Sequence, residues 1–169
     1  ENTIPGFEDY NVRIKSKSGF YLPNPPRDSR TFKTKNGLAN FITSDITYAR
    51  SLDRFMMMTI RSHDQYNTTI YGLDDRYRGI KNGRRVVLMN NNDIINLGLS
   101  KGSMVDLCSE MNSGEVVSPK WFVVPYEIPE GNVATYFPES NILIPLDSVA
   151  DRSNTPTSKS VPISITKSN

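Results

Sequence analysis

Polar side chains of several chemical kinds directly follow one apolar run of this chain. The run, residues 55–60, reads Phe-Met-Met-Met-Thr-Ile and is typical of a buried strand. The side chains after it carry a guanidinium, an imidazole, amides, hydroxyls and phenols; they are Arg61, His63, Gln65, Tyr66, Asn67, Thr68, Thr69 and Tyr71. A guanidinium can bind phosphate with two parallel hydrogen bonds, and amides can bind the edges of flat rings. This set suits a polyphosphate or a fused heterocycle, and the alternative is a polar loop that satisfies only its own backbone.

A second group of polar side chains follows an aromatic segment nearer the end of the chain. Residues 133–137 read Val-Ala-Thr-Tyr-Phe and favour a strand. The polar residues after it are Glu139, Ser140, Asn141, Asp147, Ser148, Asp151, Ser153, Asn154, Thr155, Thr157, Ser158 and Lys159. Loops held by a rigid scaffold commonly carry binding residues. We therefore expect the two polar groups to form parts of one binding site.

The residue counts exclude several kinds of reactive site within this chain. His63 and Cys108 are its only histidine and cysteine, so multi-histidine and multi-cysteine metal sites and an internal disulfide are excluded. Three methionines at 56–58 are interpreted as core residues, since thioethers fill irregular gaps well. Asp74 and Asp75 are interpreted as a solvated or salt-bridged pair, because no third carboxylate follows at ligand spacing. We predict no catalytic residue and no metal ligand in this chain.

Length and charge narrow the class of protein. A chain of 169 residues is expected to form one domain with a sizeable core. A net charge of +2 does not indicate a nucleic-acid partner, and no apolar stretch approaches the roughly 20 residues of a membrane span. We therefore expect no nucleic-acid binding, no membrane insertion and a cytoplasmic location. Because the chain begins at Glu1 rather than Met, we expect it to be part of a longer polypeptide.

Hydrophobic periodicity and turn signals predict the elements that would position these residues. Residues 1–35 are rich in proline and basic side chains and are predicted to be an entry arm, with the barrel domain at 36–169. The predicted strands lie at about 38–42, 55–60, 84–89, 104–108, 121–126, 133–137 and 161–166, with a short helix at 93–97 capped by the asparagines before it. Short strands separated by turns at this spacing predict a mainly β fold, a closed β-barrel with one or two short helices.

Four segments together resemble one protein family. They are Thr59–Thr68 (TIRSHDQYNT), Asn92–Gly102 (NDIINLGLSKG), Gly131–Asn141 (GNVATYFPESN) and Asp151–Lys159 (DRSNTPTSK). They resemble the C-terminal molybdopterin-dinucleotide-binding domain of DMSO-reductase-like molybdoenzymes, in the branch of formate dehydrogenase alpha subunits. The resemblance covers nearly the whole chain, from about residue 19 to residue 165.

This resemblance implies a fold, a cofactor and a set of site residues. The fold is a double-psi β-barrel of the aspartate-decarboxylase-like kind, and the cofactor is bis(molybdopterin guanine dinucleotide) with Mo or W. The implied cofactor-binding residues are Thr59, Arg61, Gln65, Tyr66, Asn67, Thr68, Asn141, Asn154 and Lys159, and His63 lies on the same loop. The family's metal ligand and its 4Fe-4S cluster belong to preceding domains of the same polypeptide, which are the expected partners. This chain alone is therefore not expected to catalyse a reaction, whereas the whole protein is expected to be an oxidoreductase.

Two other functions remain open on the residues alone. A standalone double-psi barrel can serve as a protein-interaction module, as do barrel domains attached to remodelling ATPases; the segment at 93–102 and the basic arm motivate this alternative. A nucleic-acid-binding barrel is suggested by basic and aromatic residues within positions 1–35, although the small net charge opposes it.

Overall fold

The protein forms two compact units, residues 1–47 and 48–169. The structure, a computed structural model, describes residues 3–45, 53–65 and 72–169. The assignment of residues 1–35 to an entry arm stays a prediction.

The first unit is built from local contacts and has two short helices. They are α1, Tyr10–Arg13, and α2, Pro25–Ser29. Helix α2 begins at prolines, whose missing NH is not needed in a first turn, and the Asn24 side chain accepts a hydrogen bond from the NH of Arg27 at 3.2 Å. None of residues 3–45 is buried.

The strand predicted at residues 38–42 is not formed. This segment has no regular secondary structure, and the side chains of Phe41 and Ile42 are 102% and 88% exposed. Its apolar composition resembles that of a strand, but no pairing strand lies against it within the described residues, and a strand requires such a partner.

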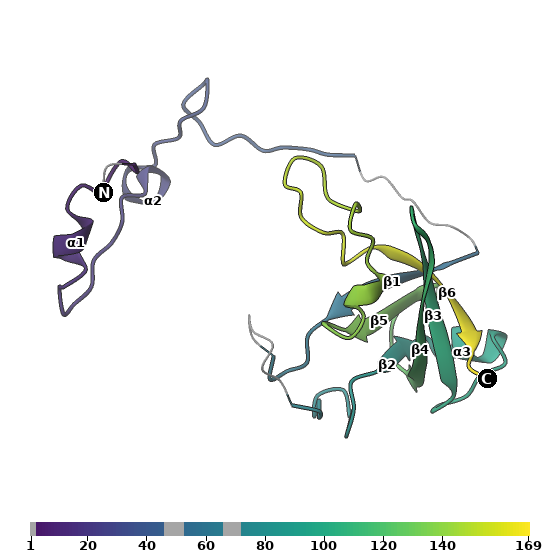
Figure 1. Ribbon diagram of the computed structural model, residues 1–169. Coiled ribbons are helices and arrows are strands. Elements are labelled where there is room, and N and C mark those ends of the chain that lie inside the picture. The colour runs from purple at the N-terminus through teal and green to yellow at the C-terminus, as the bar shows by residue number, and fades with distance from the viewer. Residues whose placement is uncertain (1–2, 46–52, 66–71) are drawn as a thin grey trace. The chain divides into compact units, whose positions relative to one another are not determined.

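The second unit is a closed barrel of six strands (Figure 1). The strands are β1 Phe55–Ile60, β2 Val86–Met89, β3 Met104–Met111, β4 Gly114–Pro125, β5 Asn132–Tyr136 and β6 Val161–Lys167. Their order around the barrel is β1-β5-β2-β4-β3-β6. Two pairs, β1 with β5 and β2 with β4, are parallel and are joined by crossing connections, while the other pairs are antiparallel. This is the double-psi β-barrel, and the predicted mainly β fold is confirmed.

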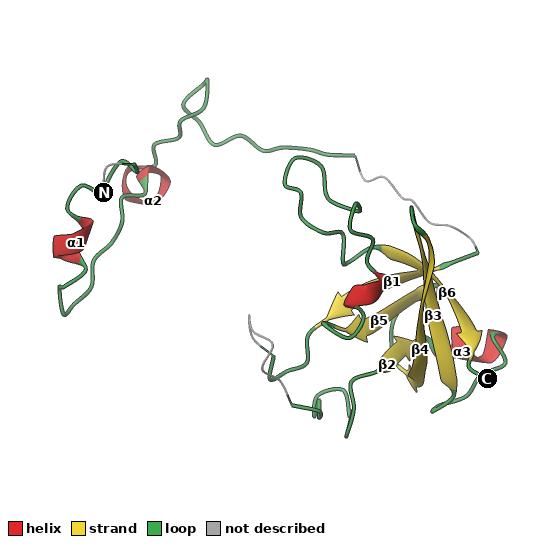
Figure 2. Ribbon diagram, in the orientation of Figure 1, coloured by secondary structure: helices red, strands yellow, loops and turns green. Residues whose placement is uncertain are grey.

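Residues 104–125 form one long hairpin instead of the predicted separate short strands. Strand β4 is 12 residues long and pairs with β3 along most of its length and with β2 through residues 122–125. The register of this pairing shifts between Val105 and Leu107, as at a β-bulge. Two further helical segments complete the unit, α3 Asn91–Asn96 and η1 Asn141–Leu143. Figure 2 shows α3 at the end of the barrel opposite to the arrowheads of β1 and β5.

Apolar side chains are buried on both faces of part of this sheet. One cluster includes Met57, Leu107 and Trp121, so Met57 is a core residue as predicted. The same prediction is wrong for Met58, which points away from the barrel interior on the alternating strand and is 39% exposed. A second cluster packs Val86 and Leu88 on the outer face of β2 against Ile80, Ala134 and Tyr136. Because segment 72–83 supplies Ile80 and covers this outer face, β2 is buried on both sides and reads as a continuous apolar run. No helix among the described residues is long and apolar enough to cross a membrane.

Truncation of a side chain in this cluster should destabilise the chain. Leu107 is 0% exposed, so Leu107→Ala should lower the free energy of unfolding by about 2–5 kcal/mol through lost burial and a residual cavity. The matched control is Leu146→Ala, whose side chain is 98% exposed and whose loss should change stability by about 0.5 kcal/mol or less. Urea unfolding measures both, and equal effects would contradict the assignment of Leu107 to the core.

Candidate functional site

Four chain segments meet at one end of the barrel, which we call the site end. Strands β1 and β5 are parallel with Ile60 opposite Tyr136, and the NH of Phe137 donates to the carbonyl of Ile60 at 2.9 Å. Strand β2 runs antiparallel to β5, and β6 runs antiparallel to β1, so the starts of β2 and β6 lie at this same end. Residues 61–65 of the first polar group and residues 139–141 and 158–159 of the second are thereby brought to one end of the barrel.

Three basic residues line a groove at the site end, which we call the Lys159 groove. It has a volume of about 610 Å³ and is lined by Thr59, Ile60, Arg61, Arg78, Phe137, Ser158 and Lys159. The Lys159 ammonium donates to the carbonyl of Thr59 and lies 3.3 Å from its hydroxyl oxygen. Burial and then the charge of Arg61 lower the pKa of Lys159. Because no described lining residue is acidic, the groove favours an anion.

A buried arginine joins the two loops of the site end. Arg84, directly before β2, is only 4% exposed, and its Nε donates to Glu139 Oε1 at 2.7 Å. Its other nitrogens donate to Ser62 Oγ at 2.7 Å, to Gln65 Oε1 at 3.0 Å and to the carbonyl of Phe137 at 2.8 Å. A buried charge is tolerated when it is paired and hydrogen-bonded in this way. Arg84 therefore holds the loop after β1 against the loop after β5.

A second buried network lies under segment 72–83. Asp75 is 1% exposed and accepts hydrogen bonds from the Tyr136 hydroxyl at 2.7 Å and from Arg78 at 2.6 Å. Burial opposes ionisation of Asp75, but hydrogen bonds from Tyr136 and Arg78 outweigh it and the pKa of the carboxyl is lowered. Burial, followed by the hydrogen bond to Asp75, raises the pKa of Tyr136. Arg78 also donates to the carbonyl of Arg61 at 3.3 Å, so this network supports the Lys159 groove.

The predicted loop residues Gln65 and His63 have different surroundings. Gln65 is 6% exposed, and its amide donates to the carbonyl of Phe137 at 2.9 Å while its oxygen accepts from Arg84. Its hydrogen-bonding groups thus hold the loop. The Nε2 of His63 lies 2.8 Å from Asp64 Oδ1, and its ring packs edge-on against Tyr77 with centroids 4.8 Å apart. The buried Nδ1 of His63 has no hydrogen-bond partner within the described part of the chain.

The remaining predicted residues are distributed unevenly. Thr59 is buried at the end of β1, and Asn141 is exposed at the start of η1, so both belong to the site end. Asn154 lies in the segment between η1 and β6, which Figure 1 shows in yellow-green as a loop extending beyond the strands; its NH bonds locally to the carbonyl of Ala150 at 3.1 Å. Tyr66, Asn67 and Thr68 lie outside the described residues.

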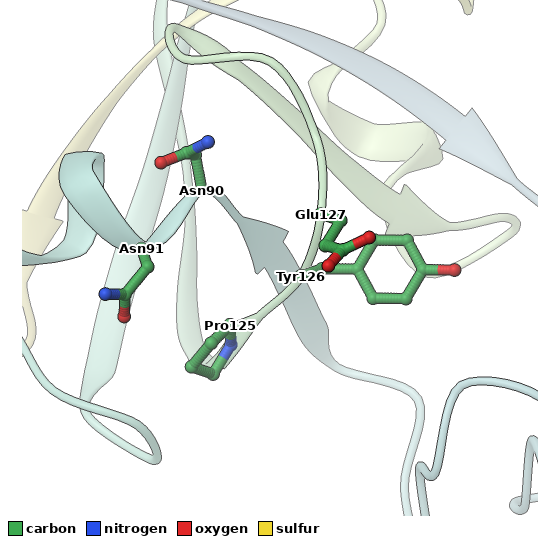
Figure 3. A pocket seen from close by; sticks show the side chains of 5 residues that line it. All are labelled: Asn90, Asn91, Pro125, Tyr126 and Glu127. Atoms are coloured by element: carbon green, nitrogen blue, oxygen red, sulfur yellow. The ribbon is translucent and has the colours of Figure 1, made fainter.

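Another hollow, of about 590 Å³, lies at the opposite end of β2 (Figure 3). It is lined by Asn90, Asn91, Pro125, Tyr126 and Glu127. The Asn90 side chain donates to the carbonyl of Ile128 at 2.7 Å and accepts from the NH of Asn92 at 2.8 Å, which caps α3. The Asn90 amide therefore has a structural role, as the sequence predicted for the asparagines before this helix.

Comparison with known proteins identifies the family. The family model described as "Molydopterin dinucleotide binding domain" matches residues 55–162. The chain belongs to this family. The match spans all of β1 to β5 and reaches the start of β6, so the molybdopterin-dinucleotide-binding domain coincides with the barrel.

The relatives of this molybdopterin-dinucleotide-binding domain are much longer proteins. An uncharacterized oxidoreductase of Mycobacterium tuberculosis is 50% identical over 164 residues, which are 94% of this chain and 21% of that protein. Protein YdeP of Escherichia coli K12 is 40% identical over 177 residues, covering 100% of this chain and 23% of YdeP. The chain thus spans about a fifth of the length of these relatives. Acetylene hydratase from Pelobacter acetylenicus is structurally similar at 13% identity, with a TM-score of 0.46 over 67% of this chain and 18% of that chain.

Sequence reasoning missed the buried residues that organise the site end. Arg84 was interpreted only as the start of a strand, and Asp75 only as one of an acidic pair. The one local signal for Arg84 is its place immediately before the apolar run of β2, where a charge has little access to water. The predicted salt-bridged state of Asp75 is confirmed, but as a buried pair with Arg78.

Removal of the Arg84 guanidinium should destabilise the chain strongly. Arg84→Met leaves the carboxylate of Glu139 buried without its partner, and we expect the free energy of unfolding to fall by roughly 3–5 kcal/mol. The double variant Arg84→Met/Glu139→Gln should be more stable than the sum of the two single effects predicts. Urea unfolding of all four proteins completes the cycle, and strictly additive losses would show that the two side chains do not interact.

The Asp75 network should make stability depend on acid pH. The pKa of Asp75 is lower in the folded chain than in the unfolded one, so its contribution is present above about pH 4 and is lost as pH falls through the folded pKa. The stability gap between the wild type and Asp75→Asn should therefore narrow as pH is lowered from about 5 to about 2. Asp151→Asn, with a side chain 97% exposed, is the control and should show a gap near zero throughout. A difference in stability between the wild type and Asp75→Asn that does not change with pH would contradict the hydrogen bonds assigned to the ionised Asp75.

Proposed function

We propose that this chain binds and orients a bis(molybdopterin guanine dinucleotide) cofactor as the C-terminal domain of a larger molybdenum or tungsten oxidoreductase of formate-dehydrogenase-like type. The observation that carries the proposal is that two cationic residues, Arg61 and Lys159, line the same groove at the site end and lie close to each other. Family membership and oxidoreductase relatives support it.

The Lys159 groove has the chemistry that such a cofactor requires. Two like charges lie close enough for Arg61 to lower the pKa of Lys159, and an anion between them would relieve that repulsion. The groove also presents the hydroxyl-bearing Ser158 and the partly buried ring of Phe137. A dinucleotide cofactor carries phosphates and flat, hydrogen-bonding rings, so these residues fit it.

The proposed roles follow from where each side chain lies and from its chemistry. Arg61 and Lys159 would bind phosphate oxygens, and the exposed Asn141 amide would bind polar edges of the rings. Gln65 would act indirectly, because its hydrogen bonds to Phe137 and Arg84 hold the loop in place. The redox chemistry would be the cofactor's, while this chain binds and orients it.

The rest of the longer protein would supply what this chain lacks. Because relatives are about five times longer, the metal ligand, the substrate site and the 4Fe-4S cluster, where present, would belong to the other domains of the polypeptide. Those preceding domains are the proposed partners, and together they would enclose the cofactor.

Loss of both cations should deplete the cofactor. In the full-length protein, Arg61→Ala/Lys159→Ala should reduce the content of guanine nucleotide and of Mo or W per polypeptide by roughly tenfold, because charge-assisted hydrogen bonds to phosphate are lost. Nucleotide release on denaturation and elemental analysis measure the two contents. Lys33→Ala/Lys35→Ala removes the same charge from exposed positions of the first unit and should leave them unchanged.

Two outcomes would count against the proposal. Wild-type full-length protein without guanine nucleotide and without either metal would exclude the cofactor, and would return attention to a protein-interaction role for the barrel. Full cofactor content in Arg61→Ala/Lys159→Ala would remove these two residues from the site. Formate-dependent reduction of an artificial electron acceptor tests the finer assignment, and its absence in loaded protein would overturn the formate part alone.

A further inference from the structure

Residues 38–42 have the composition of a strand, Leu-Ala-Asn-Phe-Ile, but no strand pairs with them in the described chain. Figure 2 shows the described part of the connection after α2 as a loop. No backbone NH or carbonyl of residues 39–42 forms a hydrogen bond within the described residues. Backbone groups of an apolar segment need partners once water is excluded, so this segment is suited to pair with another strand.

A turn with its own hydrogen bonds leads into this segment. The Thr34 hydroxyl donates to the carbonyl of Leu38 at 2.8 Å, and the Asn36 amide donates to the side-chain oxygen of Asn40 at 2.8 Å. The NH of Leu38 donates to Asn36 Oδ1 at 3.1 Å. These contacts order the chain just before Phe41, which lowers the conformational entropy that would be lost on pairing.

The apolar side chains of the segment would lie on both faces of an added strand. Successive side chains of a strand point to opposite sides, so Phe41 would face one layer while Leu38 and Ile42 face the other. The exposed fractions of Leu38, Phe41 and Ile42 are 63%, 102% and 88%. Strands that are apolar on both faces belong to sheets that are covered on both faces. The matching partner is therefore the edge of a sheet with an apolar layer on each side.

The barrel of this chain does not offer such an edge. Each of its six strands has two neighbours in the closed order β1-β5-β2-β4-β3-β6. The match to YdeP includes residues 38–42, because it covers 100% of this chain, yet it covers only 23% of YdeP. A polypeptide of that length has room for a further sheet, and a strand of the same polypeptide would meet the segment at a high effective concentration.

We infer that residues 38–42 add a strand to the edge of a sheet elsewhere in the longer polypeptide to which this chain belongs. Main-chain hydrogen bonds supply the pairing, and Phe41 and Ile42 enter apolar pockets on the two faces of that sheet. This inference rests on the part of the proposed function that makes the chain a domain of a larger protein, and it does not depend on the cofactor.

Hydrogen–deuterium exchange tests the pairing by comparing the full-length protein with the 169-residue chain. The amides of residues 39–42 should exchange at least about a hundredfold more slowly in the full-length protein, because they become hydrogen-bonded. The amides of residues 105–109 lie in β3 between two neighbouring strands and should be slow in both. Equally fast exchange of residues 39–42 in both proteins would overturn the inference. Slowing in the 169-residue chain that increases with its concentration would indicate a second copy and would overturn the partner proposed here.

Single proline substitutions in the full-length protein test the backbone directly. Ala39→Pro and Asn40→Pro each remove one NH, and neighbouring NH groups of a strand point to opposite sides. At the edge of a sheet only one of the two faces the partner, so one variant should restore fast exchange of the remaining amides and the other should not. Asn40→Ala is the control, because it loses the contact with Asn36 but keeps the NH. Slow exchange in both proline variants would contradict the pairing.

Side-chain substitutions test the two faces of the strand. Phe41→Asp/Ile42→Asp in the full-length protein should restore fast exchange of residues 39–42 while residues 105–109 remain slow, which shows that the barrel is still folded. Val12→Asp, at a 74% exposed position of α1, is the control and should leave residues 39–42 slow. The same loss of protection in Val12→Asp would indicate general apolar contact rather than a strand, and would overturn the inference.

The exchange measurement separates this inference from the proposed function. Slow amides at residues 39–42 in full-length protein that contains no guanine nucleotide and no metal would support the strand while the proposed function fails. Fast amides in protein loaded with the cofactor would overturn the strand alone.

Discussion

The buried guanidinium of Arg84 is the interaction on which the site end depends. A charge that is 4% exposed must have partners, and here they come from two loops that follow different strands. Glu139 and the carbonyl of Phe137 belong to the loop after β5, while Ser62 and Gln65 belong to the loop after β1. Movement of either loop alone would leave buried polar groups unpaired. The closed barrel provides the rigid base, because its parallel pair β1 and β5 delivers both loops to the same end.

The Asp75 network extends this rigidity to the residues that face the groove. Tyr136 and Arg78 converge on one buried carboxylate, and Arg78 continues to the carbonyl of Arg61. The backbone next to the two groove cations is thus held in place: Arg78 donates to the carbonyl of Arg61, and the NH of Thr59 donates to the carbonyl of Ser158, which directly precedes Lys159. A precise site needs such support, since unsupported long side chains lose rotational freedom when they bind.

Two grooves lie next to each other, and Arg78 lines both of them. On one side, Arg61 lies near enough to Lys159 to contribute, after burial, to the lowered pKa of its ammonium. On the other, a groove of about 800 Å³ is lined by Lys81, Lys101 and the half-exposed Phe122. Arg78 itself is balanced by Asp75 and serves both grooves as structure. Basic side chains therefore lie on both sides of the Arg78–Asp75 ion pair.

Local sequence patterns determined much of this protein: the strand at 55–60, the mainly β barrel, the capped helix after β2 and the positions of the two polar groups. These depend on periodicity and on neighbours along the chain. The tertiary structure alone decided which polar residues line the Lys159 groove and which hold the loops. In the sequence, Gln65 is predicted to bind the cofactor, but in the fold its side chain holds a loop. The reason is that its hydrogen-bond acceptor, the carbonyl of Phe137, lies 72 residues away along the chain. Arg84 and Glu139 are 55 residues apart, and residues 38–42 have strand-like composition but no partner strand in the described chain. Burial of a charge and pairing of a strand both require groups that only folding brings together, so neither can be read from a single segment.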